Sequence, residues 1–158
     1  MKILVINGPN MQLLGRRKAE FYGTKTLPEI EADLRAAADS LGVTVDFFQS
    51  NHEGAICDRI ADAITGGVDG IVINPAAYTH TSIAILDALK AVALPAVEVH
   101  LSDVSVRESF RRVSYAGLAC RKTFMGLGFE GYRRAILFLR DAIEGPPRNA
   151  DSPDTAEG

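Results

Sequence analysis

The sequence lacks the long apolar runs, the one-sided charge and the closely spaced cysteines that mark several large classes of protein. No apolar run approaches the about 18 residues of a membrane-spanning helix, so we expect no membrane segment. The net charge is −3, and the segment 145–158 supplies most of it. The nearly neutral remainder is unlike a basic nucleic-acid-binding domain, so we expect no nucleic-acid partner. Cys57 and Cys120 lie far apart, and no secretory leader precedes the apolar run 2–6. We therefore expect a cytoplasmic protein with free, buried thiols.

Signatures of metal and nucleotide sites are also missing. The sequence has no Gly-Lys-Ser/Thr phosphate loop, and its three histidines, His52, His80 and His100, show neither HExxH spacing nor a neighbouring cysteine pair. We expect no metal and no cofactor. The stretch GLGFEG (126–131) matches G-x-G-x-x-G, but a dinucleotide fingerprint belongs to the first strand–helix unit. Here only a helix pattern and the tail follow, so we interpret its glycines as a tight turn and close helix packing.

Short apolar runs alternate with amphipathic stretches along the chain, of which 47% is hydrophobic. The runs predict strands over 2–6, 43–48, 70–73, 95–99 and 122–126. The stretches predict helices over 26–41, 53–65, 81–92 and 129–144, and a shorter helical turn over 106–111. Thr26 and Glu29 form a capping box at the start of the first helix. This alternation predicts an α/β fold of the flavodoxin-like kind, a doubly wound five-stranded parallel sheet with helices on both faces. We expect one domain over residues 1–144 and a disordered tail over 145–158.

Polar residues are concentrated where the predicted strands end. In an open α/β sheet, ligands bind beyond the carboxyl ends of the strands. The segments at that edge are rich in Asn, His and Ser, which favours a polar small molecule; they are NGPN (7–10), QSNHEG (49–54), NPAAYTH (74–80), HLSD (100–103) and GLGFEG (126–131).

Glu98 and His100 stand two residues apart near the end of a predicted strand, so both side chains project from the same face. A carboxylate beside an imidazole fixes which ring nitrogen carries the proton and favours the protonated ring, which makes a usable general acid. A simple surface salt bridge has the same spacing, and periodicity does not separate the two.

VRESFRR (106–112) places Arg107 and Arg111 four residues apart, on one face if the segment is helical. Two neighbouring guanidinium groups repel each other unless a negative charge lies between them. An anionic ligand, Glu108 or a partner subunit could supply that charge. Arginine suits the planar recognition of a carboxylate.

Two further segments add polar groups at the same edge. In NPAAYTHTS (74–82), Thr81 or Ser82 can cap the following helix, whose N-terminus favours an anion, and His80 adds a donor. In NGPN (7–10), Asn10 offers an amide.

The stretch GRRKAEFYG (15–23) sets three cations, among them Arg17, just before Phe21 and Tyr22. A tyrosine held near arginines loses its proton more easily than a free one. With an acid–base histidine, an amide and donors for a carboxylate, this inventory indicates proton abstraction and elimination on a small hydroxylated acid.

Several long motifs, in one order over about residues 2–140, resemble those of the type II 3-dehydroquinate dehydratases (type II dehydroquinases). They are NGPNMQLLG, FYG, QSNHEG, NPAAYTHTS, EVHLSDVSVRESFRR and GLGFEGY. The resemblance implies a homododecamer built as a tetramer of trimers, with neither metal nor cofactor. It implies conversion of 3-dehydroquinate to 3-dehydroshikimate and water by anti elimination through an enolate, a step of both the shikimate pathway and quinate catabolism. A diverged lyase on a related hydroxylated cyclic acid and a non-catalytic small-anion-binding homologue are the alternatives.

The resemblance also implies roles for single residues. Tyr22 would be the base that removes the proton at C2, and Arg17 would lower its pKa. His100, oriented by Glu98, would protonate the departing C1 hydroxyl, and Asn10 would hold the water that stabilises the enolate. The substrate would be bound by Asn74, His80, Leu101, Ser102 and Arg111. Asp87 would reach a neighbouring subunit's site, and Arg107 would support the lid, the stretch 15–23 that carries Tyr22.

The sequence departs from the family's usual motifs at four places, one of which is CRKTFM (120–125) before GLG, where the family usually has a glycine and an apolar strand. Arg17-Lys18-Ala19 stands where the family has Arg-Glu-Pro, Ser102-Asp103 where it has Ser-Asn, and Ile85-Leu86-Asp87 where it has Leu-Arg-Asp. No departure removes a residue to which the resemblance gives a role.

Overall fold

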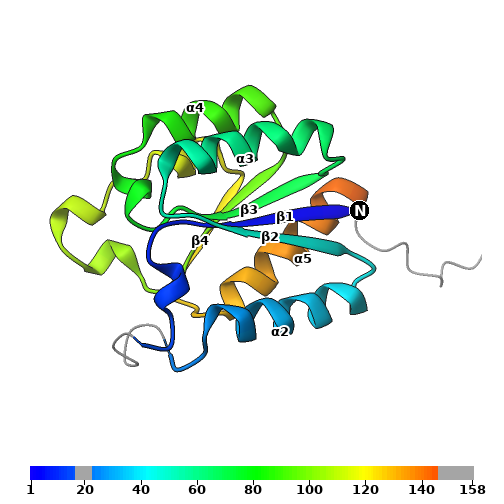
Figure 1. The fold of residues 1–158 in the computed structure, drawn as a ribbon, viewed down its shortest axis with the longest axis horizontal. Coiled ribbons are helices and arrows are strands. Elements are labelled where there is room, and N and C mark those ends of the chain that lie inside the picture. Colours follow the sequence, from blue (N-terminus) through cyan, green and yellow to red (C-terminus); the bar gives the residue numbers. More distant parts are fainter. Residues whose placement is uncertain (17–22, 146–158) are drawn as a thin grey trace, which may run out of the picture.

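A five-stranded, all-parallel sheet runs through the middle of the molecule (Figure 1). The computed structural model describes residues 1–16 and 23–145. The strand order β2-β1-β3-β4-β5 is that of a doubly wound sheet, and the predicted fold class is confirmed. The strands are β1 (Lys2–Asn7), β2 (Thr44–Gln49), β3 (Gly70–Asn74), β4 (Ala96–His100) and β5 (Lys122–Met125).

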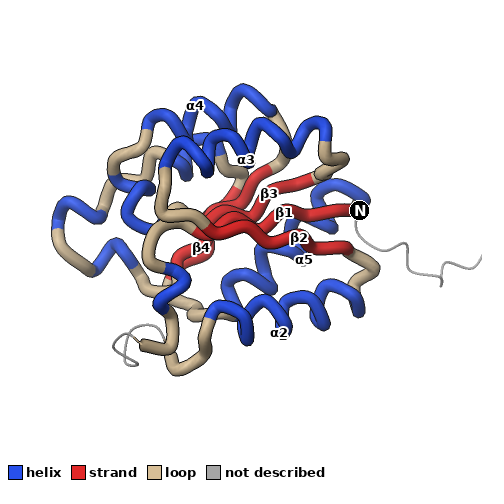
Figure 2. The backbone as a smooth tube through the Cα atoms, viewed as in Figure 1, coloured by secondary structure: helices blue, strands red, loops and turns tan. Residues whose placement is uncertain are grey.

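Helices cover both faces of the sheet, so that two separate apolar cores flank it (Figures 1 and 2). Side chains alternate across each strand: Val5 packs into the core below the sheet, and Leu4 into the core above it. Below lie α2 (Leu27–Ser40) and α5 (Glu130–Glu144); above lie α3 (Glu53–Thr65) and α4 (Ile83–Val92).

Local signals in the sequence account for several boundaries. Thr26 caps α2 in a complete capping box with Glu29, as predicted. Of the two candidate caps of α4, Ser82 is the one used, and it accepts a hydrogen bond from the backbone N–H of Ile85.

The glycines of GLGFEG act as the sequence indicated. Gly126 and Gly128 both adopt positive φ, which an L side chain rarely does. A Cβ on Gly131 would lie 3.2 Å from Val99 Cγ1, so this glycine lets α5 pack closely on β4.

The predicted helical turn over 106–111 is wrong in detail. The structure has two 3₁₀ turns there, η3 (Val104–Val106) and η4 (Ser109–Arg111), with Arg107 in extended backbone between them. The Asp103 side chain accepts a hydrogen bond from the Ser105 N–H, which starts the first turn early and separates it from the second. Sequence patterns also missed η1 (Met11–Leu13), η2 (Ala76–His80) and η5 (Ala116–Ala119).

Some predictions concern residues outside the described ranges. These are the roles of Arg17 and Tyr22, the Lys18-Ala19 departure, and the tail beyond Gly145. Within 1–16 and 23–145, none of the helices has both the length and the apolar character needed to cross a membrane.

Candidate active site

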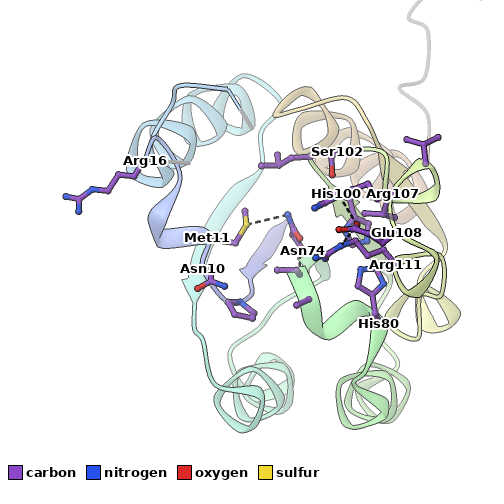
Figure 3. A pocket seen from close by; sticks show the side chains of 16 residues that line it. Asn10, Met11, Arg16, Asn74, His80, His100, Ser102, Arg107, Glu108 and Arg111 are labelled. Carbon is purple, nitrogen blue, oxygen red and sulfur yellow. Dashed lines mark hydrogen bonds and ion pairs between the residues drawn. The ribbon is translucent and has the colours of Figure 1, made fainter. Parts of the chain in front are cut away.

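A cleft opens beyond the carboxyl ends of β1, β3 and β4, where the fold class predicts a ligand site (Figure 3). Its volume is about 940 Å³, in the range of small-molecule sites. Most of the side chains singled out by the sequence line it; they are Asn10, Asn74, His80, His100, Leu101, Ser102, Arg107 and Arg111. The described residues contain no group of three or more His, Cys, Asp or Glu side chains placed to hold a metal ion.

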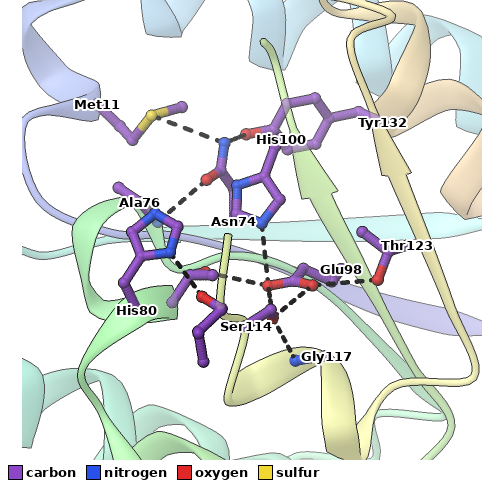
Figure 4. Close-up of polar contacts among 12 residues, drawn as sticks. Met11, Asn74, Ala76, His80, Glu98, His100, Ser114, Gly117, Thr123 and Tyr132 are labelled. Atoms are coloured by element: carbon purple, nitrogen blue, oxygen red, sulfur yellow. Dashed lines mark hydrogen bonds and ion pairs between the residues drawn. The ribbon is translucent and has the colours of Figure 1, made fainter. Parts of the chain in front are cut away.

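Glu98 lies beneath the cleft and is completely buried, inside strand β4. Hydroxyl groups surround its carboxylate (Figure 4). Thr79 donates to Oε1 at 3.0 Å, Thr123 donates to Oε2 at 3.1 Å, and Ser114 lies 2.8 and 2.9 Å from the two oxygens. A buried carboxylate is costly unless it is paired and hydrogen-bonded, and this one has both kinds of partner. The surface salt bridge that the sequence left open is therefore excluded.

His100 is the ionisable partner of Glu98. Its Nε2 lies 3.0 Å from Glu98 Oε1, and only 5% of the side chain is exposed. Burial acts to raise the pKa of Glu98. The close contact with the His100 ring and the hydrogen bonds from the hydroxyls of Ser114 and Thr79 together outweigh burial, and they hold the pKa of Glu98 below its usual value. Glu98 is thus kept as a carboxylate facing the imidazole.

His80 stands beside His100 on the wall of the cleft, with the two rings stacked at 6.5 Å between centroids. Its Nδ1 lies 2.7 Å from the backbone carbonyl of Val113. Because a carbonyl only accepts, Nδ1 must carry a proton. Whenever the ring is neutral, Nε2 is therefore unprotonated and can accept a hydrogen bond from a ligand.

Asn74 is held by a buried chain of hydrogen bonds at the floor of the cleft (Figure 4). Tyr132 donates its hydroxyl proton to Asn7 Oδ1 at 2.5 Å and accepts from Asn74 Nδ2 at 2.9 Å. Asn74 Oδ1 accepts from the Ala76 N–H at 3.1 Å. These contacts distinguish the oxygen end of the Asn74 amide from its nitrogen end and hold both in place. Sequence motifs assigned Tyr132 no role, although its place among buried positions of α5 marks it as a polar group needing a partner.

We expect Tyr132→Phe to lower the free energy of unfolding by about 1–3 kcal/mol, because it leaves Asn7 and Asn74 with unpaired buried groups. Denaturant unfolding measures the loss. Tyr78→Phe is the matched control, since the Tyr78 hydroxyl donates to an exposed carbonyl, that of Asn51, which water can satisfy. Equal losses in both variants would show that the buried chain has no special weight.

Glu108 lies between the two arginines at the rim. Its Oε2 is 2.9 Å from Arg111 Nε and 3.7 Å from Arg107 Nε. Of the counter-charges that the sequence left open, the structure therefore shows Glu108. Although the two arginines do not share a helix face, both line the cleft.

Asn10 is exposed at the rim in a left-handed backbone conformation, with φ 68°. Its N–H donates to Asn51 Oδ1 at 2.9 Å, which ties this turn to the segment after β2. Asp87 is exposed on α4 and does not line the cleft of its own chain. Its reach into a neighbouring subunit stays a prediction.

Comparison with known proteins gives one consistent family. The family model described as dehydroquinase class II matches residues 1–140. The chain is 55% identical over 134 residues to the catabolic 3-dehydroquinase of Aspergillus clavatus, covering 85% of this chain and 89% of the relative. It is 52% identical over 136 residues to the 3-dehydroquinate dehydratase of Bordetella avium, covering 86% and 94%.

Solved structures agree. The type II dehydroquinase from Butyrivibrio crossotus superposes with a TM-score of 0.87 at 46% identity, covering 89% of this chain and 97% of that one. The type II dehydroquinase from Propionibacterium acnes gives a TM-score of 0.83 at 40% identity, covering 87% and 94%.

Proposed function

The chain belongs to the class II dehydroquinase family, and we propose that its cleft removes water from 3-dehydroquinate to give 3-dehydroshikimate. The observation that carries the proposal is the buried Glu98–His100 pair, set beneath a cleft with arginines on its rim. An acid that can give up a proton, next to groups that bind a carboxylate, is what elimination from a hydroxy acid requires.

His100 supplies the proton for the leaving group. Its Nε2 faces Glu98, so Nδ1 remains for a ligand, and the protonated ring can donate there. The C1–O bond breaks as this proton reaches the hydroxyl oxygen, and water leaves. The negative charge of Glu98 stabilises the imidazolium before the transfer.

Arg111 and the groups around it hold the substrate. A guanidinium at the rim can exchange its Glu108 partner for the substrate carboxylate. His80 and Asn74, with fixed donor and acceptor ends, suit hydroxyl groups on the ring, and the Leu101 backbone and Ser102 add further donors.

The base side of the reaction rests on the motif resemblance. Tyr22 removes the proton at C2, next to the ketone, and Arg17 lowers its pKa. Asn10 orients the water that stabilises the enolate. The electrons of the broken C–H bond form the enolate, which then expels the C1 hydroxyl and leaves a C=C bond conjugated with the ketone.

Ultraviolet absorbance tests the proposed reaction, because the conjugated enone absorbs where the substrate does not. We expect absorbance to rise when 3-dehydroquinate is added. Turnover of another hydroxylated cyclic acid, without turnover of 3-dehydroquinate, would favour a diverged lyase. Binding without any turnover would favour an anion-binding homologue.

We also propose that the chain assembles in the cytoplasm as a homododecamer of four trimers. Large apolar side chains are exposed on η3, η4 and η5, among them Val106 (78% exposed), Phe110 (64%) and Leu118 (69%). Exposed apolar side chains of this size are typical of a surface that another subunit covers. Asp87, outside the cleft of its own chain, is available to a neighbour's.

We expect Asp87→Ala and His100→Gln subunits, dissociated, mixed and reassembled, to be more active than either variant alone. In a mixed assembly, some sites combine His100 from one subunit with Asp87 from its neighbour. The same variants mixed without dissociation are the control. A reassembled mixture no more active than the average of its parts would place Asp87 outside the shared site.

A further inference from the structure

Ser114 contacts the Glu98 carboxylate more extensively than the other hydroxyls do. Thr79 and Thr123 each reach one oxygen, whereas Ser114 Oγ lies within 2.9 Å of both. It comes from the irregular segment before η5, which sequence patterns left without a role.

The direction of the Ser114 proton is fixed by its other neighbour. The backbone N–H of Gly117 donates to Ser114 Oγ at 2.9 Å. With that lone pair occupied by a donor, the hydroxyl proton is free to point at the carboxylate. Ser114 is therefore a donor to Glu98 and not an acceptor.

The strap (Val113, Ser114 and Tyr115) links His80 to the carboxylate of Glu98. Val113 O meets His80 Nδ1, Ser114 Oγ meets Glu98, and Tyr115 N–H donates to Thr79 O at 2.8 Å. Three successive residues thus contact His80, Glu98 and Thr79, and the Thr79 hydroxyl itself donates to Glu98.

The contact between Glu98 and His100 depends on fine alignment. Although His100 Nε2 is at ion-pair distance from Oε1, it is the one buried side-chain polar atom among the described residues that makes no well-angled hydrogen bond. A small rotation of the carboxylate decides whether that bond forms, and catalytic hydrogen bonds often tighten only with the ligand in place.

We propose that Ser114 is a positioning residue, which holds the Glu98 carboxylate in the orientation that aligns His100 Nε2 and leaves Nδ1 to face the substrate. The acid then depends on a hydroxyl that never touches the substrate. The inference rests on the proposed function only for its turnover measurement, because the state of the His100 ring can be observed without any substrate.

Ser114→Ala tests the proposal with protein labelled with ¹⁵N in histidine. The chain has three histidines, so a long-range ¹H–¹⁵N spectrum shows three ring systems. We expect the His100 ring signals to move from those of a ring with its Nε2–H held against Glu98 toward those of a mixture of tautomers. His80, bonded to a backbone carbonyl, and the exposed His52 should keep their signals. We expect kcat on 3-dehydroquinate to fall about 10- to 100-fold with KM little changed, as for other residues that orient a catalytic group.

Two further variants complete the experiment. Ser40→Ala removes an exposed hydroxyl at the end of α2 and should change neither the spectrum nor kcat. Gly117→Ala places a Cβ 2.7 Å from Glu98 Oε2 and 2.8 Å from Ser114 Oγ, so it disturbs the same contact without deleting the hydroxyl. We expect it to shift the His100 signals as Ser114→Ala does. If Ser114→Ala does not fold, Gly117→Ala takes its place as the variant that tests the proposal.

The proposal would be overturned if the His100 signals stayed unchanged in folded Ser114→Ala, whatever happens to kcat. If Ser114→Ala does not fold, unchanged His100 signals in folded Gly117→Ala would overturn it in the same way. A fall in kcat with movement only of His80 would overturn it as well, because Ser114 would then act on binding. If 3-dehydroquinate is not turned over at all, the ring signals still decide whether Ser114 aligns His100.

Discussion

His100→Gln should lower kcat on 3-dehydroquinate about 10²- to 10⁴-fold, the usual contribution of a general acid. Glutamine keeps an amide that can donate to Glu98, so the buried carboxylate retains a partner, but it cannot give up a proton to the leaving hydroxyl. KM should change much less, because the arginines at the rim and Asn74 remain. Steady-state kinetics at the pH optimum of the wild type measure both constants.

His52→Gln is the matched control for that variant. His52 lies just before α3, is exposed, and makes no side-chain capping bond, so its loss should leave kcat near that of the wild type. A kcat for His100→Gln within a few-fold of the wild type would remove His100 from the role of acid.

Tyr22→Phe should abolish turnover while leaving ligand binding largely intact, a fall in kcat again of about 10²- to 10⁴-fold. Only the proton transfer is lost, since phenylalanine keeps the ring and removes the hydroxyl. Binding of 3-dehydroquinate to the variant can be measured by calorimetry without interference from turnover.

Tyr78→Phe serves as the control here too, because the Tyr78 hydroxyl donates to Asn51 O and does not line the cleft. Substantial residual activity in Tyr22→Phe, with normal activity in the control, would mean that another group takes the proton at C2.

Local sequence features predicted much of the fold because their causes are local. The capping box at Thr26 acts within one turn of helix, and each apolar run is long enough for one strand. The spacing of Glu98 and His100 sufficed to place them on one face, since strand side chains alternate with period two.

The surroundings of Glu98 could not be found in this way. Thr79, Ser114 and Thr123 come from three separate segments, and only the completed sheet and the packed loops bring them to one carboxylate. Glu98 and Thr123 become neighbours because β4 pairs with β5 in a register that no single segment encodes.

The arginines at the rim of the cleft could also be predicted only in part from the sequence. Helical spacing predicted that Arg107 and Arg111 lie close together on one helix face, but a side-chain hydrogen bond at Asp103 divides the segment into two short turns. Their grouping survives because Glu108 pairs with both guanidinium groups, an outcome that the sequence offered as one of three.

The most direct test of the mechanism is the fate of stereospecific deuterium at C2 of 3-dehydroquinate, followed by NMR during turnover by the wild-type chain. A base and His100 acting on opposite faces predict that the label anti to the C1 hydroxyl is lost and that the syn label stays in the enone product. Loss of the syn label, with the anti label kept, would contradict this assignment of acid and base.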